Sequence, residues 1–525
     1  MGKASECQSL PLEHLAEQIY RQIARQFPVC CASDEFYFFP QVAGDGDARW
    51  TWDDFSPVNL ETFAARSRQW EADLDQLRHN APSHAERIDI GLLWRMLKSL
   101  REQLLEFSPQ RSQPTFHLNI VVAGLIQALE EDDPAAWRFR MAGLPAFLQQ
   151  AGSLLDQVPQ AFLDPGRKML ADLDLWITRL EQNGHPAGAG LAALGEFAKT
   201  LEIKSAGDSF VYPPALYERL VTEHLGCGGD LTVVEQELHS EYAEMSGLLT
   251  EEAGRLIPGY DWQQLAVRVP FIEAPNSSLQ ELYRPELLRL EAHVREAGLV
   301  PELAGALQPE LADVPAGMAA IRASDAYSSR VGHPARGGAF HIYQRARTGS
   351  GKLGRSLEYR MTAAHETWPG HHLLDVCRWN LPRTIRRPLE SPLCYEGWAC
   401  FAESLLVETG YFDGPWDRFL LARRRIERAA RGLIDIGMQT GRLSFAAAAE
   451  LLVEAGYAPR EAANVVPKYA LRPGYQVCYT LGLRRMLRLR EQCRRLDAGE
   501  FSRRVLQQGE IGFPALEHVL HTQGD

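Results

Sequence analysis

The sequence has no long apolar run. A transmembrane helix needs about 18 to 20 consecutive, mainly apolar residues, and the 525 residues contain no such uninterrupted stretch. The first twenty residues also lack the apolar segment of a secretory signal. We therefore expect no membrane partner and a cytoplasmic location.

Positive charge and pairable cysteines are scarce as well. The chain carries 55 Lys and Arg against 68 Asp and Glu, which is a formal net charge of −13. A nucleic-acid binder needs a basic surface to neutralise phosphates, so this balance argues against a nucleic-acid partner. The nine cysteines are an odd number and include no C-x-x-C pair. That pattern is typical of reduced thiols in a cytoplasm and not of a disulfide framework.

Helical patterns dominate what is present. Leu15, Ile19, Ile23 and Phe27 repeat every four residues and form one apolar stripe. We predict a mostly α protein built as a large helical assembly. Besides 12–27 and a helix that starts at Ser56 and Pro57, helices are predicted over 85–107, 118–131, 134–156, 159–182, 229–253, 279–297, 358–380, 392–409, 415–440, 444–455, 459–471, 474–495 and 498–508.

Breaks rich in proline and glycine divide this helical pattern. They lie around residues 184–190 and 298–317. We place a boundary near residue 310, with a helical N-terminal lobe over 1–310 and a C-terminal lobe that carries the chemistry over 311–525.

Residues 365–372 read HETWPGHH and contain three of the fifteen histidines. The stretch begins like the zinc signature H-E-x-x-H, in which two His one helical turn apart bind the ion. Here Pro369 stands where the second His should be. On a regular helix His372 would lie about 10 Å along the axis from His365, and His371 would point roughly 120° away. A regular helix therefore cannot bind a metal ion with this stretch.

Pro369 and Gly370 can interrupt the regular helix and so change the spacing of the histidines. Proline removes a backbone donor and forces a kink or bulge, and glycine supplies backbone freedom. A two-residue bulge would bring His371 back to one turn from His365. The alternative is a helix that stops at Trp368, with surface histidines beyond it.

A third ligand is expected on a following helix. The stretch SPLCYEGWACFAESLLVE, residues 391–408, supplies Glu396, which lies 25 residues after His371. Glu403 lies two helical turns later on the same face. We predict Glu396 as the ligand and Glu403 as a partner that orients a ligand histidine. Solvated helix carboxylates are the alternative for both.

These motifs resemble the bacterial family DUF885, whose hallmark is H-E-A-Y-P-G-H-H followed by E-G-W-A. They stand here as HETWPGHH and EGWACFAE, with RPGYQVCYTLG over 472–482 as a third element. The family itself looks like a branch of the mostly helical gluzincin metallopeptidases. The resemblance implies a zincin-like architecture, with two helical lobes around a cleft and a small β element near the active site.

The resemblance also implies roles for single residues. Helical gluzincins end their motif in Gly-His, which favours His371 over His372 as the second ligand. A later Tyr is expected to stabilise the oxyanion, and Tyr479 is our choice. Leu374 and Tyr475 depart from the usual Gln residues, and these departures bear on substrate preference.

The expected site thus has Zn²⁺ held by His365, His371 and Glu396, with His372 as the alternative ligand and Mn²⁺ or Co²⁺ as substitutes. Glu366 is the expected general base. Neighbours that are expected to orient a ligand or to bind substrate are His372, Glu403, His341, Arg472 and Tyr475.

The strand candidate acquires a role from the same resemblance. GGAFHIYQRA, residues 337–346, is the best candidate in a sequence with few. Zinc peptidases commonly align the substrate backbone along an edge strand just before the motif helix. We therefore predict an edge strand here, with a loop as the alternative, and His341 on it as a candidate substrate contact.

The predicted function is a zinc-dependent hydrolase that acts on peptides or small amides. One alternative is a metal-dependent enzyme of specialised metabolism with a non-peptide substrate. The other is a non-catalytic helical binding protein with a vestigial site. The intact Glu366 argues against the binding protein, which has no need of a general base.

Overall fold

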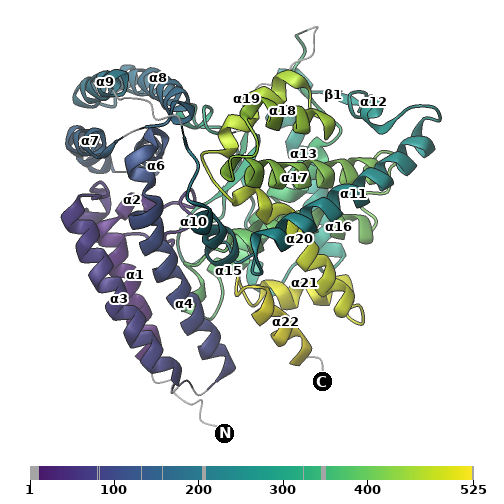
Figure 1. The fold of residues 1–525 in the computed structure, drawn as a ribbon, viewed down its shortest axis with the longest axis horizontal. Helices are drawn as coiled ribbons and strands as arrows, with labels where there is room; N and C mark the ends of the chain where they lie inside the picture. Colours follow the sequence, from purple (N-terminus) through teal and green to yellow (C-terminus); the bar gives the residue numbers. More distant parts are fainter. Residues whose placement is uncertain are drawn as a thin grey trace.

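The computed structural model describes residues 11–79, 81, 83–131, 133–156, 158–203, 209–322, 324–344 and 351–522. The protein is mostly helical with two small sheets, which confirms the predicted class (Figure 1). None of the described helices combines the length and the apolar character needed to cross a bilayer.

The N-terminal helices begin where the sequence supplies capping residues. Pro57, Pro114 and Pro134 lie at helix starts, where the missing proline donor costs nothing. Ser83 forms a capping box with Glu86. The helices are α1 (Pro11–Gln26), α2 (Pro28–Cys31), α3 (Pro57–His79), α4 (His84–Glu102), which continues into a π-helical turn (Gln103–Phe107), α5 (Pro109–Ser112), α6 (Pro114–Glu130), α7 (Pro134–Leu154), α8 (Gln160–Gln182) and α9 (Gly188–Ile203).

The later helices form the other side of the molecule in Figure 1, which runs from teal to yellow. Long helices α11 and α17 pack along each other, so helices on both sides of residue 310 share one packing unit. The predicted lobe boundary stays a prediction. The helices are α10 (Pro214–Arg219), α11 (Leu231–Leu256), α12 (Trp262–Ala266), α13 (Leu279–Glu296), α14 (Tyr359–Glu366), α15 (His371–Trp379), α16 (Pro392–Glu408), α17 (Asp417–Gln439), α18 (Phe445–Glu454), α19 (Pro459–Tyr469), α20 (Tyr475–Gln492), α21 (Ala498–Leu506) and α22 (Phe513–Thr522).

The strand predicted over 337–346 exists as β4 (Gly338–Ile342), but it is not an edge strand. It lies in the centre of a three-stranded sheet, between β2 (Glu310–Asp313), to which it is parallel, and β3 (Ala326–Ser329), to which it is antiparallel. The prediction of an edge was wrong because the short polar strands that flank β4 carry too weak a pattern to be seen. A second sheet pairs β1 (Phe271–Glu273) with β5 (Gly354–Ser356). Residues 345–346 of the predicted strand lie outside the described residues.

Helices α16 and α20 approach each other closely because two glycines face each other. A Cβ on Gly397 would lie 2.7 Å from the Cα of Gly482, and a Cβ on Gly482 would lie 2.6 Å from the Cα of Gly397. This contact explains the glycine of the E-G-W-A motif. It also brings the first turn of α20 against Glu396, next to Gly397.

Candidate metal centre

The stretch that was predicted as one helix over 358–380 is two helices separated by residues 367–370. Two backbone hydrogen bonds cross the break, from Gly370 N to Ala364 O (3.1 Å) and from Leu373 N to Thr367 O (3.4 Å). Each spans six residues, whereas a regular α-helix bond spans four. The backbone therefore accommodates two additional residues, as the octet had indicated.

Gly370 is required at this break for a steric reason. A Cβ at this position would lie 1.8 Å from the carbonyl oxygen of His365 and 2.5 Å from that of Ala364. The close approach of the preceding turn is what excludes a side chain.

The break places His371 beside His365, and both face Glu396. The two imidazole rings are nearly perpendicular, with centroids 4.7 Å apart. Glu396 Oε2 lies 3.4 Å from His365 Nε2 and 3.5 Å from His371 Nε2. One ligand atom from each of the three buried residues lies within 4.8 Å of the other two.

This geometry fits a zinc ion. Two ligand atoms of a tetrahedral zinc lie about 3.4 Å apart, because each zinc–ligand bond is about 2.0 to 2.2 Å long. Glu396 Oε2 is buried and has no hydrogen-bond partner. A buried carboxylate oxygen without a partner is costly unless a cation satisfies it.

Glu403 lies behind His365 and is fully buried. His365 Nδ1 lies 3.0 Å from Glu403 Oε1. Burial raises the pKa of the Glu403 carboxyl, but the guanidinium groups of Arg424 and Arg428 outweigh burial and hold this pKa well below its usual range. The ionised carboxylate accepts a hydrogen bond from Nδ1–H of His365, so Nε2 is the nitrogen that faces Glu396 and can bind a metal ion.

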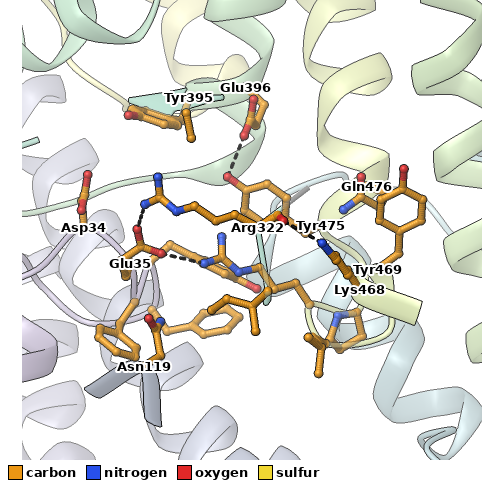
Figure 2. Close-up of a pocket in the computed structure, with 18 of the residues that line it drawn as sticks. Asp34, Glu35, Asn119, Arg322, Tyr395, Glu396, Lys468, Tyr469, Tyr475 and Gln476 are labelled. Carbon is orange, nitrogen blue, oxygen red and sulfur yellow. Dashed lines mark hydrogen bonds and ion pairs between the residues drawn. The ribbon is translucent and has the colours of Figure 1, made fainter. Parts of the chain in front are cut away.

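Each of the other two members of the cluster also has a neighbour that orients it. Tyr475 donates its hydroxyl to Glu396 Oε1 (2.7 Å), so the other carboxylate oxygen faces the histidines (Figure 2). His371 stacks on Tyr395 with centroids 4.0 Å apart. Tyr395 in turn donates its hydroxyl to the buried Asp375 (3.0 Å).

His372 lies outside the cluster. Its Nε2 donates to the carbonyl oxygen of Leu307 (2.9 Å), and its Nδ1 lies 3.2 Å from the hydroxyl of Tyr327, from which it accepts. Burial lowers the pKa of His372 to about 4, so the ring is neutral. Of the two alternatives that the sequence left, the structure brings His371 and not His372 to Glu396.

Glu366 and Tyr479 lie next to the cluster. Glu366 Oε2 accepts a hydrogen bond from the backbone N–H of Tyr327 on the edge strand β3 (2.7 Å). Burial raises the pKa of the Glu366 carboxyl. The ring of Tyr479 is nearly parallel to that of His365, with centroids 6.4 Å apart. Burial, followed by the nearby Glu396, raises the pKa of the Tyr479 hydroxyl, which keeps it protonated.

Two cavities meet at these residues. One has a volume of about 320 Å³, and the other of about 580 Å³. Both volumes lie within the range of small-molecule sites. The residues that line both cavities are Ser324, Asp325, His365, Glu366, Arg431 and Tyr479.

The smaller cavity contains charged residues that sequence reasoning did not identify. Glu35 forms ion pairs with Arg322 and, at 2.9 Å, with the predicted Arg472. Figure 2 shows Glu35 and Arg322 linked in this way, with Lys468 donating to the backbone oxygen of Arg322. Residue 35 is far from residue 322 in sequence, so no local pattern could have indicated this pair.

The structure does not bring His341 to the site. It lies on the central strand β4, its Nδ1 donates to the carbonyl oxygen of Asp313 (3.2 Å), and neither of the two cavities is lined by it. The position of His341 therefore gives no support to its predicted contact with substrate.

Three arginines of α17 do have a signal in the sequence: Arg424, Arg428 and Arg431. They recur at spacings of four and three along α17, which places them on one helical face. Three arginines on a face that is otherwise buried are a readable signal of a polar site within the core.

Comparison with protein families gives a match to "Bacterial protein of unknown function (DUF885)" over residues 41–520. No curated protein matches the sequence. Two solved structures, each 16% identical in sequence, share the fold. One is described as a candidate lipoprotein of unknown function from Shewanella oneidensis, with a TM-score of 0.73 over 98% of this chain and 100% of that chain. The other is described as a candidate lipoprotein from Colwellia psychrerythraea, with a TM-score of 0.76 over 98% of each chain.

Proposed function

This chain belongs to the bacterial family DUF885, a family of unknown function, and we propose that it is a zinc-dependent hydrolase that cleaves peptides or small amides. The observation that carries the proposal is the buried cluster of His365, His371 and Glu396, with a carboxylate oxygen that no hydrogen bond satisfies. This donor set, two imidazoles and one carboxylate, is one that catalytic zinc sites use.

The residues of the chain divide the chemistry among them. His365, His371 and Glu396 would hold the ion, which when bound polarises a carbonyl group and activates a water molecule. Glu366 accepts the proton of that water and passes it to the leaving amine. Its position in both cavities and its bond to Tyr327 N support this role.

Tyr479 donates a hydrogen bond to the oxyanion that forms at the scissile carbonyl. Its protonated hydroxyl and its place beside His365 support this role. The substrate lies beside β3, the edge strand nearest to Glu366, and extends into both cavities in a gluzincin-like arrangement.

We place the protein in the cytoplasm because the cysteines of the described part of the chain are all free and buried. The description of the two similar structures as candidate lipoproteins points to the opposite outcome. Cell fractionation of the native host with an antibody against the chain separates the two.

Metal content tests the site directly. Elemental analysis of purified protein should give about one zinc per chain in the wild type and in His372→Ala, and almost none in His371→Ala. Equal zinc in the two variants would contradict the assignment of His371. No bound zinc in the wild type after incubation with excess zinc would overturn the proposed function.

Turnover tests the chemistry. Glu366→Gln should keep its zinc and lose at least about a hundredfold in peptide hydrolysis, because the general base is gone. A wild-type protein with zinc but no turnover of any peptide or amide would overturn the hydrolase and leave the non-peptide enzyme or the binding protein.

A further inference from the structure

Arg431 differs from the other arginines that line the two cavities. Within the described ranges six arginines line these cavities, Arg431 included. The other five form ion pairs with carboxylates: Arg322 and Arg472 with Glu35, Arg423 with Glu358 and Glu427, Arg424 with Glu358 and Glu403, and Arg428 with Glu403. Within the part of the chain that the structure describes, Arg431 forms no ion pair with a carboxylate.

The contacts of Arg431 are all with uncharged groups. Nε and Nη2 donate to the side-chain amide oxygen of Gln476 (2.8 and 2.5 Å). The guanidinium carbon lies 4.4 Å from the ring centroid of Tyr479 and 5.4 Å from that of Tyr469. The amide and the rings hold the guanidinium in place but do not neutralise it.

The position of Arg431 is next to the proposed chemistry. The residue lines both cavities. The ring of Tyr479 is a neighbour of both its guanidinium, at 4.4 Å, and the ring of His365, at 6.4 Å between centroids. An anion bound by Arg431 would therefore lie near a substrate bond held at His365, His371 and Glu396.

We propose that Arg431 binds the free C-terminal carboxylate of a short peptide, so that the enzyme removes residues from the C-terminus of its substrate. This inference rests on the proposed function. A guanidinium recognises a carboxylate through parallel hydrogen bonds, and a half-buried one that lines a cavity without a counter-ion gains charge neutralisation from such a ligand. A terminal carboxylate is the anion that every peptide carries within one or two residues of its last bonds.

The test compares two sets of short peptides with the same sequences, one with free C-termini and one with C-terminal amides. Zinc-loaded wild type should cleave the free acids about ten- to a hundredfold faster in kcat/KM, which is what hydrogen bonds to one charged group contribute. Mass spectrometry of the products locates the cleaved bond, which should lie one or two residues from the C-terminus.

Arg431→Gln should abolish the preference, because it slows cleavage of the acids about ten- to a hundredfold more than cleavage of the amides. The matched control is Arg418→Gln, which removes the same charge from the exposed face of α17, where the Arg418 side chain is 64% exposed. This control should keep the wild-type preference. Arg431→Lys should restore part of it, because the charge returns without the planar fork.

A binding measurement separates recognition from turnover. In the Glu366→Gln background, calorimetric titration with one acid and amide pair should show tighter binding of the acid, and Arg431→Gln should remove the difference. Equal cleavage of acids and amides by the wild type would overturn the inference while the hydrolase stands. Cleavage of neither set would overturn the proposed function and the inference with it.

Discussion

Helix α16 carries two buried carboxylates whose surroundings are opposite. Both oxygens of Glu403 accept from Arg424 (2.9 and 3.1 Å) and from Arg428 (3.0 and 2.6 Å). Glu396, two turns earlier on the same face, has one oxygen bonded to Tyr475 and the other without a hydrogen-bond partner. One carboxylate is saturated by cations of the protein itself. The other, Glu396, has an oxygen without a hydrogen-bond partner, and the Nε2 atoms of His365 and His371 face that oxygen. It is therefore available to bind a cation from outside the protein.

The largest effect expected from this comparison concerns stability without metal. Glu403→Gln leaves the buried guanidinium of Arg428 without its counter-ion and leaves Arg424 with Glu358 alone, and should lower the free energy of unfolding by about 3 to 5 kcal/mol. Glu396→Gln keeps an acceptor for Tyr475 and should cost less than about 1.5 kcal/mol. Urea unfolding in the presence of EDTA measures both. Equal losses would show that the two carboxylates have the same structural role.

Zinc should increase the loss at Glu396. At free zinc about 100 times its Kd, binding should raise the free energy of unfolding of the wild type by about 2.7 kcal/mol. Glu396→Gln should show almost none of this gain, because one ligand is lost. The measurement is urea unfolding with and without zinc. A full gain in Glu396→Gln would mean that zinc binds elsewhere on the chain.

A smaller effect should come from the hydroxyl that orients Glu396. Tyr475→Phe keeps the ring and removes the hydrogen bond to Oε1, and should weaken zinc binding about tenfold, or about 1.4 kcal/mol. Competition with a chelator of known affinity measures the change. The control is Tyr411→Phe, which removes a hydroxyl bonded to Glu286 (2.8 Å) away from both cavities. A similar loss in both variants would contradict a specific role for Tyr475.

Much of the fold could be predicted because helix signals are local. Apolar stripes and the prolines and capping residues at helix starts lie within a few residues of each other. The bounds of α1, α7 and α16 and the start of α3 were therefore predicted to within a few residues. The strands were harder. The edge strand β3 has only four residues and takes its place from pairing with β4, which no local pattern records.

The candidate site divides in the same way. The octet indicated by itself that His365 and His371 would need two extra residues between them, and the spacing to EGWA indicated Glu396. The unpaired state of Arg431 had no such signal. It depends on which carboxylates reach the cavity from other helices, and those come from distant parts of the chain.

Local sequence is enough to give the helical class and the break between α14 and α15, because proline and glycine act on the backbone within a single octet. It also limits the candidates for the second ligand to His371 and His372. Tertiary structure alone decided that His372 turns to Leu307, that β4 is central and that one arginine of six is left without a counter-ion. Each of these outcomes depends on partners far away in the sequence, and a side chain's partners exist only once the helices have packed.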